Sequence, residues 1–233
     1  MSARLSVPSY VLPGTYVENL RFLDERTAQR DVELLFFIYD DDARALLKAE
    51  RRDIESYSPR FGFTVHMPDA VEASHEEILE ATAGYASSFV IHPPRVDDRL
   101  SDFVYLMDEW RGRYGPDRFF LENTVLTRFD TANRALADSE YGPPRLCADI
   151  GHLRVEGVEP SAWVAERAGR ISELHVHGYD GERDHIPFAA GERWLSDLSP
   201  FARSFSGVIE MELFAWAELD AAAAILRDAW GAI

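Results

Sequence analysis

The stretch "LCADIGH", residues 146–152, decides the fold of this chain. It starts as a short apolar run, typical of a buried strand, and then reaches a carboxylate at Asp149 and an imidazole at His152. A buried carboxylate without a partner costs several kcal/mol to remove from water. A strand that ends in this way therefore predicts a partner for the acid, and a metal ion is one such partner.

Strand-like runs of this kind recur along the chain, most of them roughly 30 residues apart, which is the size of one strand plus one crossover helix. Helical patterns fill the intervals, and this alternation predicts a parallel sheet. We therefore expect an α/β fold, a (β/α)8 TIM barrel in which residues 1–233 form a single domain. The polar segment 131–144 predicts an abbreviated or irregular crossover after the fifth strand. The expected strands are residues 4–9, 32–37, 61–66, 88–93, 118–123, 145–149, 171–177 and 207–213.

Composition limits the partners and the location of the protein. The 233 residues carry a formal net charge of −17, which argues against binding of duplex nucleic acid. No apolar run reaches the roughly 18 residues that a membrane span needs, so no membrane partner is expected. Cys147 is the only cysteine, and no intrachain disulfide can form. These features predict a cytoplasmic protein with a small-molecule substrate, and they leave the oligomeric state open.

Ionisable residues gather at the ends of the expected strands. Six of the seven histidines and three acids fall there, and strand ends share one face of a TIM barrel. So many carboxylates and imidazoles on one rim would be costly without cations. Mixed ligation of this kind favours two to three transition-metal ions, Zn or Mn first. The expected metal ligands are His66, His92, Glu122, Asp149, His152, His175, His185 and Glu212. Glu210 is left open as a rival to Glu212, although the spacing from Gly207 favours Glu212.

Six ordered motifs resemble one superfamily of barrels. They are "FTVHMPD" (63–69), "VIHPP" (90–94), "FLENT" (120–124), "CADIGH" (147–152), "ELHVHGYDGERDHIPF" (173–188) and "GVIEMELF" (207–214). In this order they resemble the xylose isomerase-like superfamily, which includes endonuclease IV-type enzymes (AP endonuclease family 2). The resemblance implies the same ligand set, with Glu122 bridging two ions. Asp184 and His185 are adjacent, whereas the family separates this pair by one residue, so the third metal site departs from the family pattern.

Three stretches resemble a narrower group within that superfamily. They are "LPGTYVENLRFL" (12–23), "DVELLFF" (31–37) and "HVHGYDGERDHIPF" (175–188), and they resemble cobamide-remodelling phosphodiesterases. This resemblance implies a metal-dependent hydrolase that opens the nucleotide loop of a cobamide such as cobalamin, with Glu122 and Glu212 as catalytic residues. The expected substrate contacts are His177, Tyr179, Asp184 and Trp216.

Two other functions remain open. One-metal sugar isomerases and epimerases of the same superfamily use a Glu-Asp-His-Glu set, here Glu122, Asp149, His175 and Glu212. That alternative leaves His66 and His92 without a role. A corrinoid or sugar binder that has lost turnover is the second alternative, and the complete ligand set argues against it.

Overall fold

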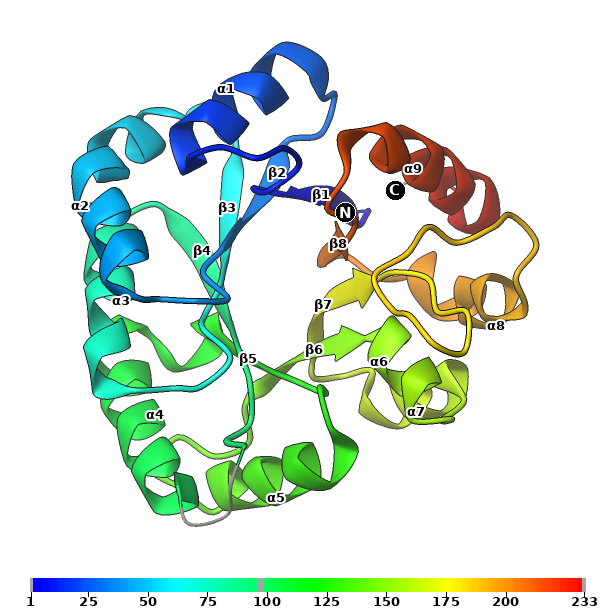
Figure 1. Ribbon diagram of the computed structural model, residues 1–233. Coiled ribbons are helices and arrows are strands. Elements are labelled where there is room, and N and C mark those ends of the chain that lie inside the picture. The colour runs from blue at the N-terminus through cyan, green and yellow to red at the C-terminus, as the bar shows by residue number, and fades with distance from the viewer. Residues whose placement is uncertain (1, 96–98, 232–233) are drawn as a thin grey trace.

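Eight parallel strands close into a barrel in strict chain order, each hydrogen-bonded to the next and β8 to β1 (Figure 1). The computed structural model describes residues 2–95 and 99–231. The expected (β/α)8 TIM barrel is confirmed, and all eight expected strands are present. The strands are β1 Arg4–Pro8, β2 Asp31–Leu35, β3 Gly62–His66, β4 Ala86–Ile91, β5 Phe119–Glu122, β6 Arg145–Asp149, β7 Ile171–Val176 and β8 Val208–Met211.

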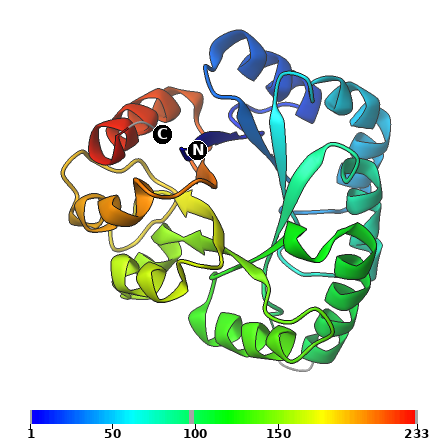
Figure 2. The same ribbon diagram turned by 180° about the vertical axis from the view of Figure 1, so that it is seen from behind.

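Helices surround the strands on the outside of the barrel (Figures 1 and 2). The crossover after β5 contains a full helix of 12 residues, so it is not abbreviated, but residues 138–144 that follow the helix are irregular, as the alternative expected. The helices of the described part are α1 Tyr16–Arg26, α2 Asp41–Ser56, α3 Glu76–Thr82, α4 Leu100–Tyr114, α5 Leu126–Ala137, α6 Ile150–Val155, α7 Pro160–Arg167, α8 Arg193–Ala202 and α9 Trp216–Trp230. None of these helices has the length and apolar character needed to cross a membrane.

Most of the hydrophobic core lies between the strands and the helices. In α4, Phe103, Met107 and Trp110 form one buried stripe, and burying each such side chain contributes about 1.5–3 kcal/mol. The inside of the barrel is different, because Val90, Phe120 and Cys147 form only a small apolar cluster there, apart from the main core. Other inward positions carry buried acids such as Glu33 and Glu210, and these polar positions are the base on which the site is built.

Strand pairing sets the height of each inward residue. The register places Asp149 beside His175 and, one strand further on, His175 beside Glu210. Side chains two residues apart on a strand point to the same face at successive heights. Glu210 and Glu212 therefore both point into the barrel, with Glu212 one layer nearer the mouth.

Candidate metal centre

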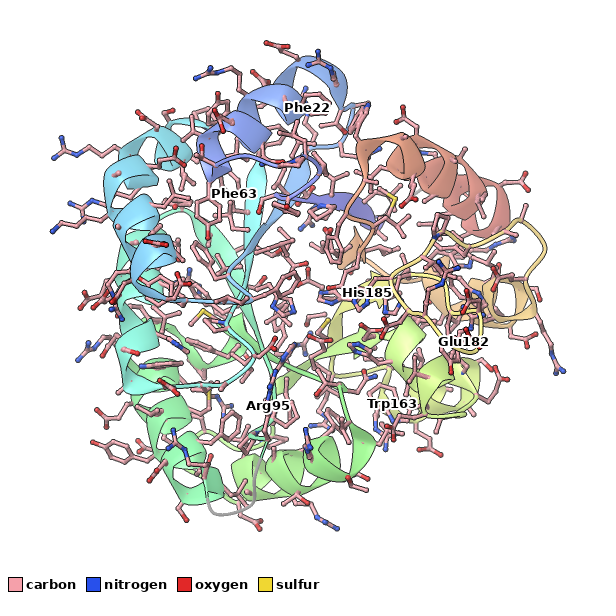
Figure 3. All side chains as sticks on the ribbon, viewed as in Figure 1. Phe22, Phe63, Arg95, Trp163, Glu182 and His185 are labelled. Atoms are coloured by element: carbon pink, nitrogen blue, oxygen red, sulfur yellow. The ribbon has the colours of Figure 1, made fainter. Side chains whose placement is uncertain are left out.

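All eight expected ligands meet at the carboxyl-terminal mouth of the barrel. Glu122 and Asp149 are the last residues of β5 and β6, and His66 ends β3. His185 comes from the loop that follows β7, and Figure 3 shows it near the middle of the barrel, with Glu182 of the same loop farther out. The others in the set are His92, His152, His175 and Glu212, which lie at or just beyond the ends of their strands.

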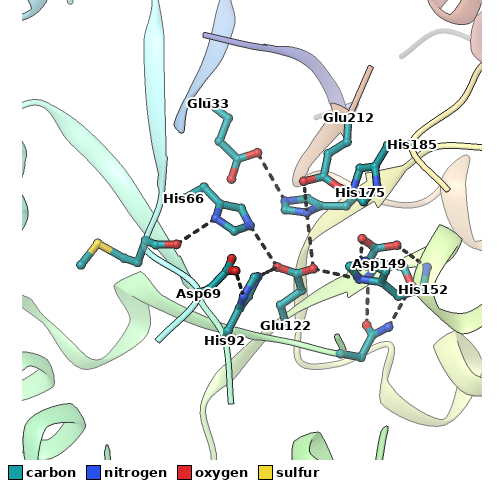
Figure 4. Close-up of polar contacts among 12 residues, drawn as sticks. Glu33, His66, Asp69, His92, Glu122, Asp149, His152, His175, His185 and Glu212 are labelled. Carbon is teal, nitrogen blue, oxygen red and sulfur yellow. Dashed lines mark hydrogen bonds and ion pairs between the residues drawn. The ribbon is translucent and has the colours of Figure 1, made fainter. Parts of the chain in front are cut away.

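Glu122 lies at the centre of this cluster, and its two oxygens face different groups (Figure 4). Its Oε2 atom lies 3.2 Å from His66 Nε2 and 2.9 Å from His92 Nε2. Its Oε1 atom lies 3.3 Å from His152 Nδ1 and 4.0 Å from His175 Nδ1. The carboxylate therefore stands between two sets of ligands and has one oxygen directed toward each.

The second set is completed by Asp149 and Glu212. Asp149 Oδ2 lies 3.0 Å from His152 Nδ1. Glu212 Oε1 lies 3.2 Å from His175 Nδ1, and Glu212 Oε2 lies 3.4 Å from His185 Nε2. Glu212, and not Glu210, is therefore the eighth-strand acid at the mouth.

The stretch "ADIGH" folds as it does because Asp149 ends a strand and caps a helix at once. Its Oδ1 atom accepts a hydrogen bond of 2.7 Å from the N–H of His152, so it is the N-cap of α6. Asn123 also holds the Asp149 backbone. Its side-chain NH₂ donates to the Asp149 carbonyl oxygen, and its Oδ1 accepts from the Asp149 N–H, both at 2.8 Å. The three-residue spacing of Asp149 and His152 thus places both side chains on one side of the mouth.

The loop after β7 is folded back by Gly178. This residue pairs with Ile186 in an isolated bridge, and a Cβ at Gly178 would lie 2.6 Å from the Ile186 carbonyl oxygen. The turn carries His185 to the mouth in a left-handed conformation with φ of 49°, which is uncommon for a residue other than glycine. The His185 N–H donates to His177 Nδ1 at 2.9 Å, which holds this strained backbone in place.

His177 follows the end of β7, and its ring is stacked against that of His185 and contacts Asp149. Its side chain is fully buried, and its Nε2 atom lies 3.2 Å from Asp149 Oδ1. The structure does not bring His177, an expected substrate contact, to the cavity lining, and its contact with Asp149 indicates that it positions this carboxylate. One ring nitrogen from each of His152, His177 and His185 lies within 4.8 Å of the others, so His177 joins a third cluster of possible ligands.

Replacement of Gly151 tests whether His177 positions Asp149. A Cβ at Gly151 would lie 2.0 Å from His177 Cε1, and the buried ring would have to move. We expect Gly151→Ala to fold but to bind Zn²⁺ roughly 10–100-fold more weakly, the usual cost of losing a group that orients a ligand. Competition with a chromophoric chelator measures this affinity. Gly169→Ala is the control, because no atom lies within 4 Å of its added methyl group, and equal affinities of both variants would contradict the positioning role.

The donor set fits divalent cations. Several of its atoms are buried without any hydrogen-bond partner among the described residues, which is unusual for polar groups in a folded protein. Imidazole nitrogens mixed with carboxylate oxygens suit Zn or Mn, and the groups that converge include His66, His92 and Glu122. The unpartnered atoms are Asp149 Oδ2, His152 Nδ1, both ring nitrogens of His175, His177 Nε2 and Glu212 Oε2.

The charges of the cluster shift its pKa values. Burial alone would raise the pKa of Glu122, but His92 and the other histidines hold it well below its usual value. Burial alone would lower the pKa of His152, yet Asp149 and Glu122 raise it to about 12. Likewise, Glu212 and Asp149 raise the pKa of His185 to about 9 against the effect of burial. Without cations, the site is a network of imidazolium and carboxylate groups.

Metal binding should therefore release protons. His152 and His185 have pKa values above 7 in the metal-free protein, so both are protonated at pH 7 and must lose a proton to become ligands. We expect about one proton or more released per bound ion. Calorimetric titration with Zn²⁺ in two buffers of different ionisation enthalpy measures the number. Binding without proton release would show that these two rings are not ligands.

A cavity of about 610 Å³ opens above the cluster, and both polar and apolar side chains line it. Asp184 and His185 line it, as expected for a substrate contact by Asp184. The structure does not bring the other two expected contacts to it: the Tyr179 hydroxyl donates to the Gly181 carbonyl oxygen, and Trp216 packs edge-on against Phe22. Residues that sequence reasoning missed line it instead, namely Phe37, Ile38, Asp69, Arg95, Thr124, Arg128 and Phe214.

Solved structures share this fold over almost the whole chain. A 3-keto-D-glucoside 4-epimerase from E. coli is 14% identical with a TM-score of 0.66, and the match covers 98% of this chain and 99% of that one. An AP endonuclease, family 2, from Brucella melitensis is 12% identical with a TM-score of 0.62, covering 95% and 97%. A D-psicose 3-epimerase is 11% identical with a TM-score of 0.62, covering 98% and 100%.

These similarities concern the fold. They confirm the expected resemblance to xylose isomerase-like barrels, including an AP endonuclease of family 2. No protein-family model matches the sequence, and comparison with curated proteins gives no match. All three proteins are enzymes by their descriptions, and two of them are sugar epimerases.

Proposed function

We propose that this protein is a metal-dependent phosphodiester hydrolase that acts on a small or medium-sized anionic substrate. The observation that carries the proposal is the division of the Glu122 carboxylate, which has one oxygen toward His66 and His92 and the other toward His152. A carboxylate that faces two ligand sets is suited to join two cations. Two metal ions accelerate the hydrolysis of a phosphodiester, because they activate water and neutralise charge on the attacking and leaving oxygens.

The residues of the chain have distinct tasks in this proposal. His66 and His92 would hold one ion, and Asp149, His175 and Glu212 the other, with Glu122 shared. Arg95 and Arg128 line the cavity and supply positive charge for the phosphodiester of the substrate. Phe37, Ile38 and Phe214 line the same cavity and offer apolar contacts to the rest of the substrate. Arg95 also pairs with Asp69, and other acids line the cavity, so the bound cations would have to supply much of the positive charge that an anionic substrate needs.

A cobamide is the first substrate to test. The sequence resemblance to cobamide-remodelling phosphodiesterases supports this choice, and a cobamide combines a phosphodiester with a large apolar ring. The exposed Ile38 and the neighbouring Phe37 and Phe214 are placed at the rim where such a ring would have to rest.

A sugar isomerase or epimerase is the second candidate. It is supported by the meeting of Glu122, Asp149, His175 and Glu212, the one-metal set of such enzymes. The solved structures favour this alternative over the hydrolase, because two of the three described above are sugar epimerases. In this case His66 and His92 would have no ligand role, although both lie within 3.2 Å of Glu122.

Metal content and product analysis separate the two candidates. Protein purified without chelator is analysed for metals, and we expect two or more ions per chain for the hydrolase and one for the epimerase. The loaded protein is then incubated with adenosylcobalamin and, separately, with ketohexoses. Release of a nucleotide-loop fragment supports the hydrolase, and interconversion of sugars overturns it. No turnover of either substrate with Zn²⁺ or Mn²⁺ would favour a binding protein.

A further inference from the structure

Three glutamates occupy the barrel interior one layer below the mouth. They are Glu33 of β2, Glu173 of β7 and Glu210 of β8, and all three side chains are fully buried. Glu173 lies two residues before His175, and Glu210 lies two residues before Glu212, so each points inward beneath a member of the mouth cluster. No step of the proposed hydrolysis uses them.

The carboxylate oxygens of this layer have no partners. All six are buried, and no hydrogen bond reaches any of them from the described residues. The buried hydroxyls of Ser6 and Thr64 are also without partners, and the register sets them beside Glu210 and Glu33. Eight oxygen atoms without partners in one layer of a barrel are a strong exception to the rule that buried polar groups are satisfied.

His175 faces Glu33, a member of this layer (Figure 4). Its ring is fully buried, and its Nε2 atom lies 3.4 Å from Glu33 Oε2 while Nδ1 faces Glu212. One oxygen of Glu33, one of Glu173 and one ring nitrogen of His175 lie within 4.8 Å of one another. Glu33 and Glu173 therefore converge with His175 on one point, and Glu210 is the strand neighbour of His175.

The three buried carboxyl groups of this layer must be neutralised. Three carboxylates that repel one another in a dry interior require either protons or a cation. Protonated carboxyls would need acceptors for their own hydrogens. The nearby Arg4 does not serve this layer, because it pairs with Asp31.

We propose that Glu33, Glu173 and Glu210 form a second, inner cation site beneath the metal centre of the mouth. Its donors are carboxylate oxygens supplemented by the Ser6 and Thr64 hydroxyls, and oxygen ligands of this kind suit a hard divalent cation, Mn²⁺ or Mg²⁺. His175 Nε2 lies 3.4 Å from Glu33 Oε2, so a proton on Nε2 would leave the lone pair of Nδ1 directed to the mouth. The inner ion thus fixes the ring that the outer centre uses.

The test counts ions and does not depend on turnover, so it is independent of the proposed hydrolysis. Protein prepared with Mn²⁺ as the only added metal is dialysed and analysed for manganese. We expect the double variant Glu173→Gln, Glu210→Gln to bind one ion fewer per chain than the wild type. His92→Ala should lose manganese from the mouth and keep the inner ion, and the exposed control Glu80→Gln, Glu109→Gln should bind as the wild type does.

An unchanged manganese content in the folded double variant overturns the proposal, because the carboxyls would then be protonated acids. Should that variant fail to fold, crystals of the Mn²⁺-loaded wild type decide the matter by anomalous scattering. A peak among the three glutamates supports the inner site. Peaks at the mouth with none in the layer below overturn it.

Discussion

The Glu122→Gln variant should keep the fold and lose turnover by on the order of 10³-fold or more, because it removes the charge shared by both ligand sets. The amide matches the carboxylate in size, but it can present only one oxygen. Its NH₂ group would face either the His66 and His92 pair or His152, where a metal ligand or a proton acceptor is needed. One of the two sets must therefore lose its central ligand.

The measurement is the rate of phosphodiester cleavage by the Zn²⁺- or Mn²⁺-loaded variant, with circular dichroism as the check on folding. Glu109→Gln is the matched control, because Glu109 is exposed on α4 and the substitution makes the same chemical change away from the mouth. Activity within a few-fold of wild type for Glu122→Gln would show that another carboxylate is central. Loss of the circular dichroism signal would instead assign Glu122 a structural role.

The barrel and its mouth could be predicted from the sequence because the relevant signals are local. Each strand is a short apolar run, and parallel strands in a barrel bring their carboxyl ends to one rim. Residues at strand ends, such as His66, Glu122 and Asp149, are therefore neighbours in space whatever the helices do. The structure brings together all eight expected ligands, seven of them at or near strand ends, whereas the loop residue His185 was expected from the family resemblance.

Residues on loops could not be predicted in the same way. Tyr179 and Trp216 lie close in sequence to site residues, yet Trp216 packs against Phe22 and the Tyr179 hydroxyl binds within its own turn. The path of these loops depends on contacts with distant elements. Phe37 and Arg128, which do line the cavity, carry no local mark that separates them from ordinary loop or helix residues.

The inner glutamates were missed although the signal was present. Glu173 and Glu210 stand at strand positions i−2 from two expected ligands, and alternation alone sets them on the same inward face. An acidic residue in the middle of a fully buried strand needs a partner inside the protein, because its carboxyl group cannot reach water. The question of Glu210 or Glu212 arose from the same alternation, and the structure resolves it by depth, with both acids inward.

The His92→Ala variant gives the sharpest separation of the two candidate functions. His92 Nε2 lies 2.9 Å from Glu122 Oε2, and its Nδ1 atom lies 3.6 Å from Asp69 Oδ1. A carboxylate behind the far nitrogen of a histidine is the usual support of a metal ligand. His66 is the other imidazole at Glu122 Oε2. Without His92, this ligand set keeps only one histidine and is too small to hold an ion.

We expect His92→Ala to bind one ion fewer at the mouth and to cleave phosphodiesters on the order of 10²–10³-fold more slowly, because one of two ions that share the charge of the reaction is lost. His75→Ala is the matched control, since His75 is also buried but packs against Tyr39 away from the mouth. Elemental analysis and the cleavage assay are run on both variants. A one-metal epimerase predicts the opposite pattern, because Glu122, Asp149, His175 and Glu212 stay complete in His92→Ala. Full metal content together with full sugar turnover in that variant would therefore replace the hydrolase by the epimerase.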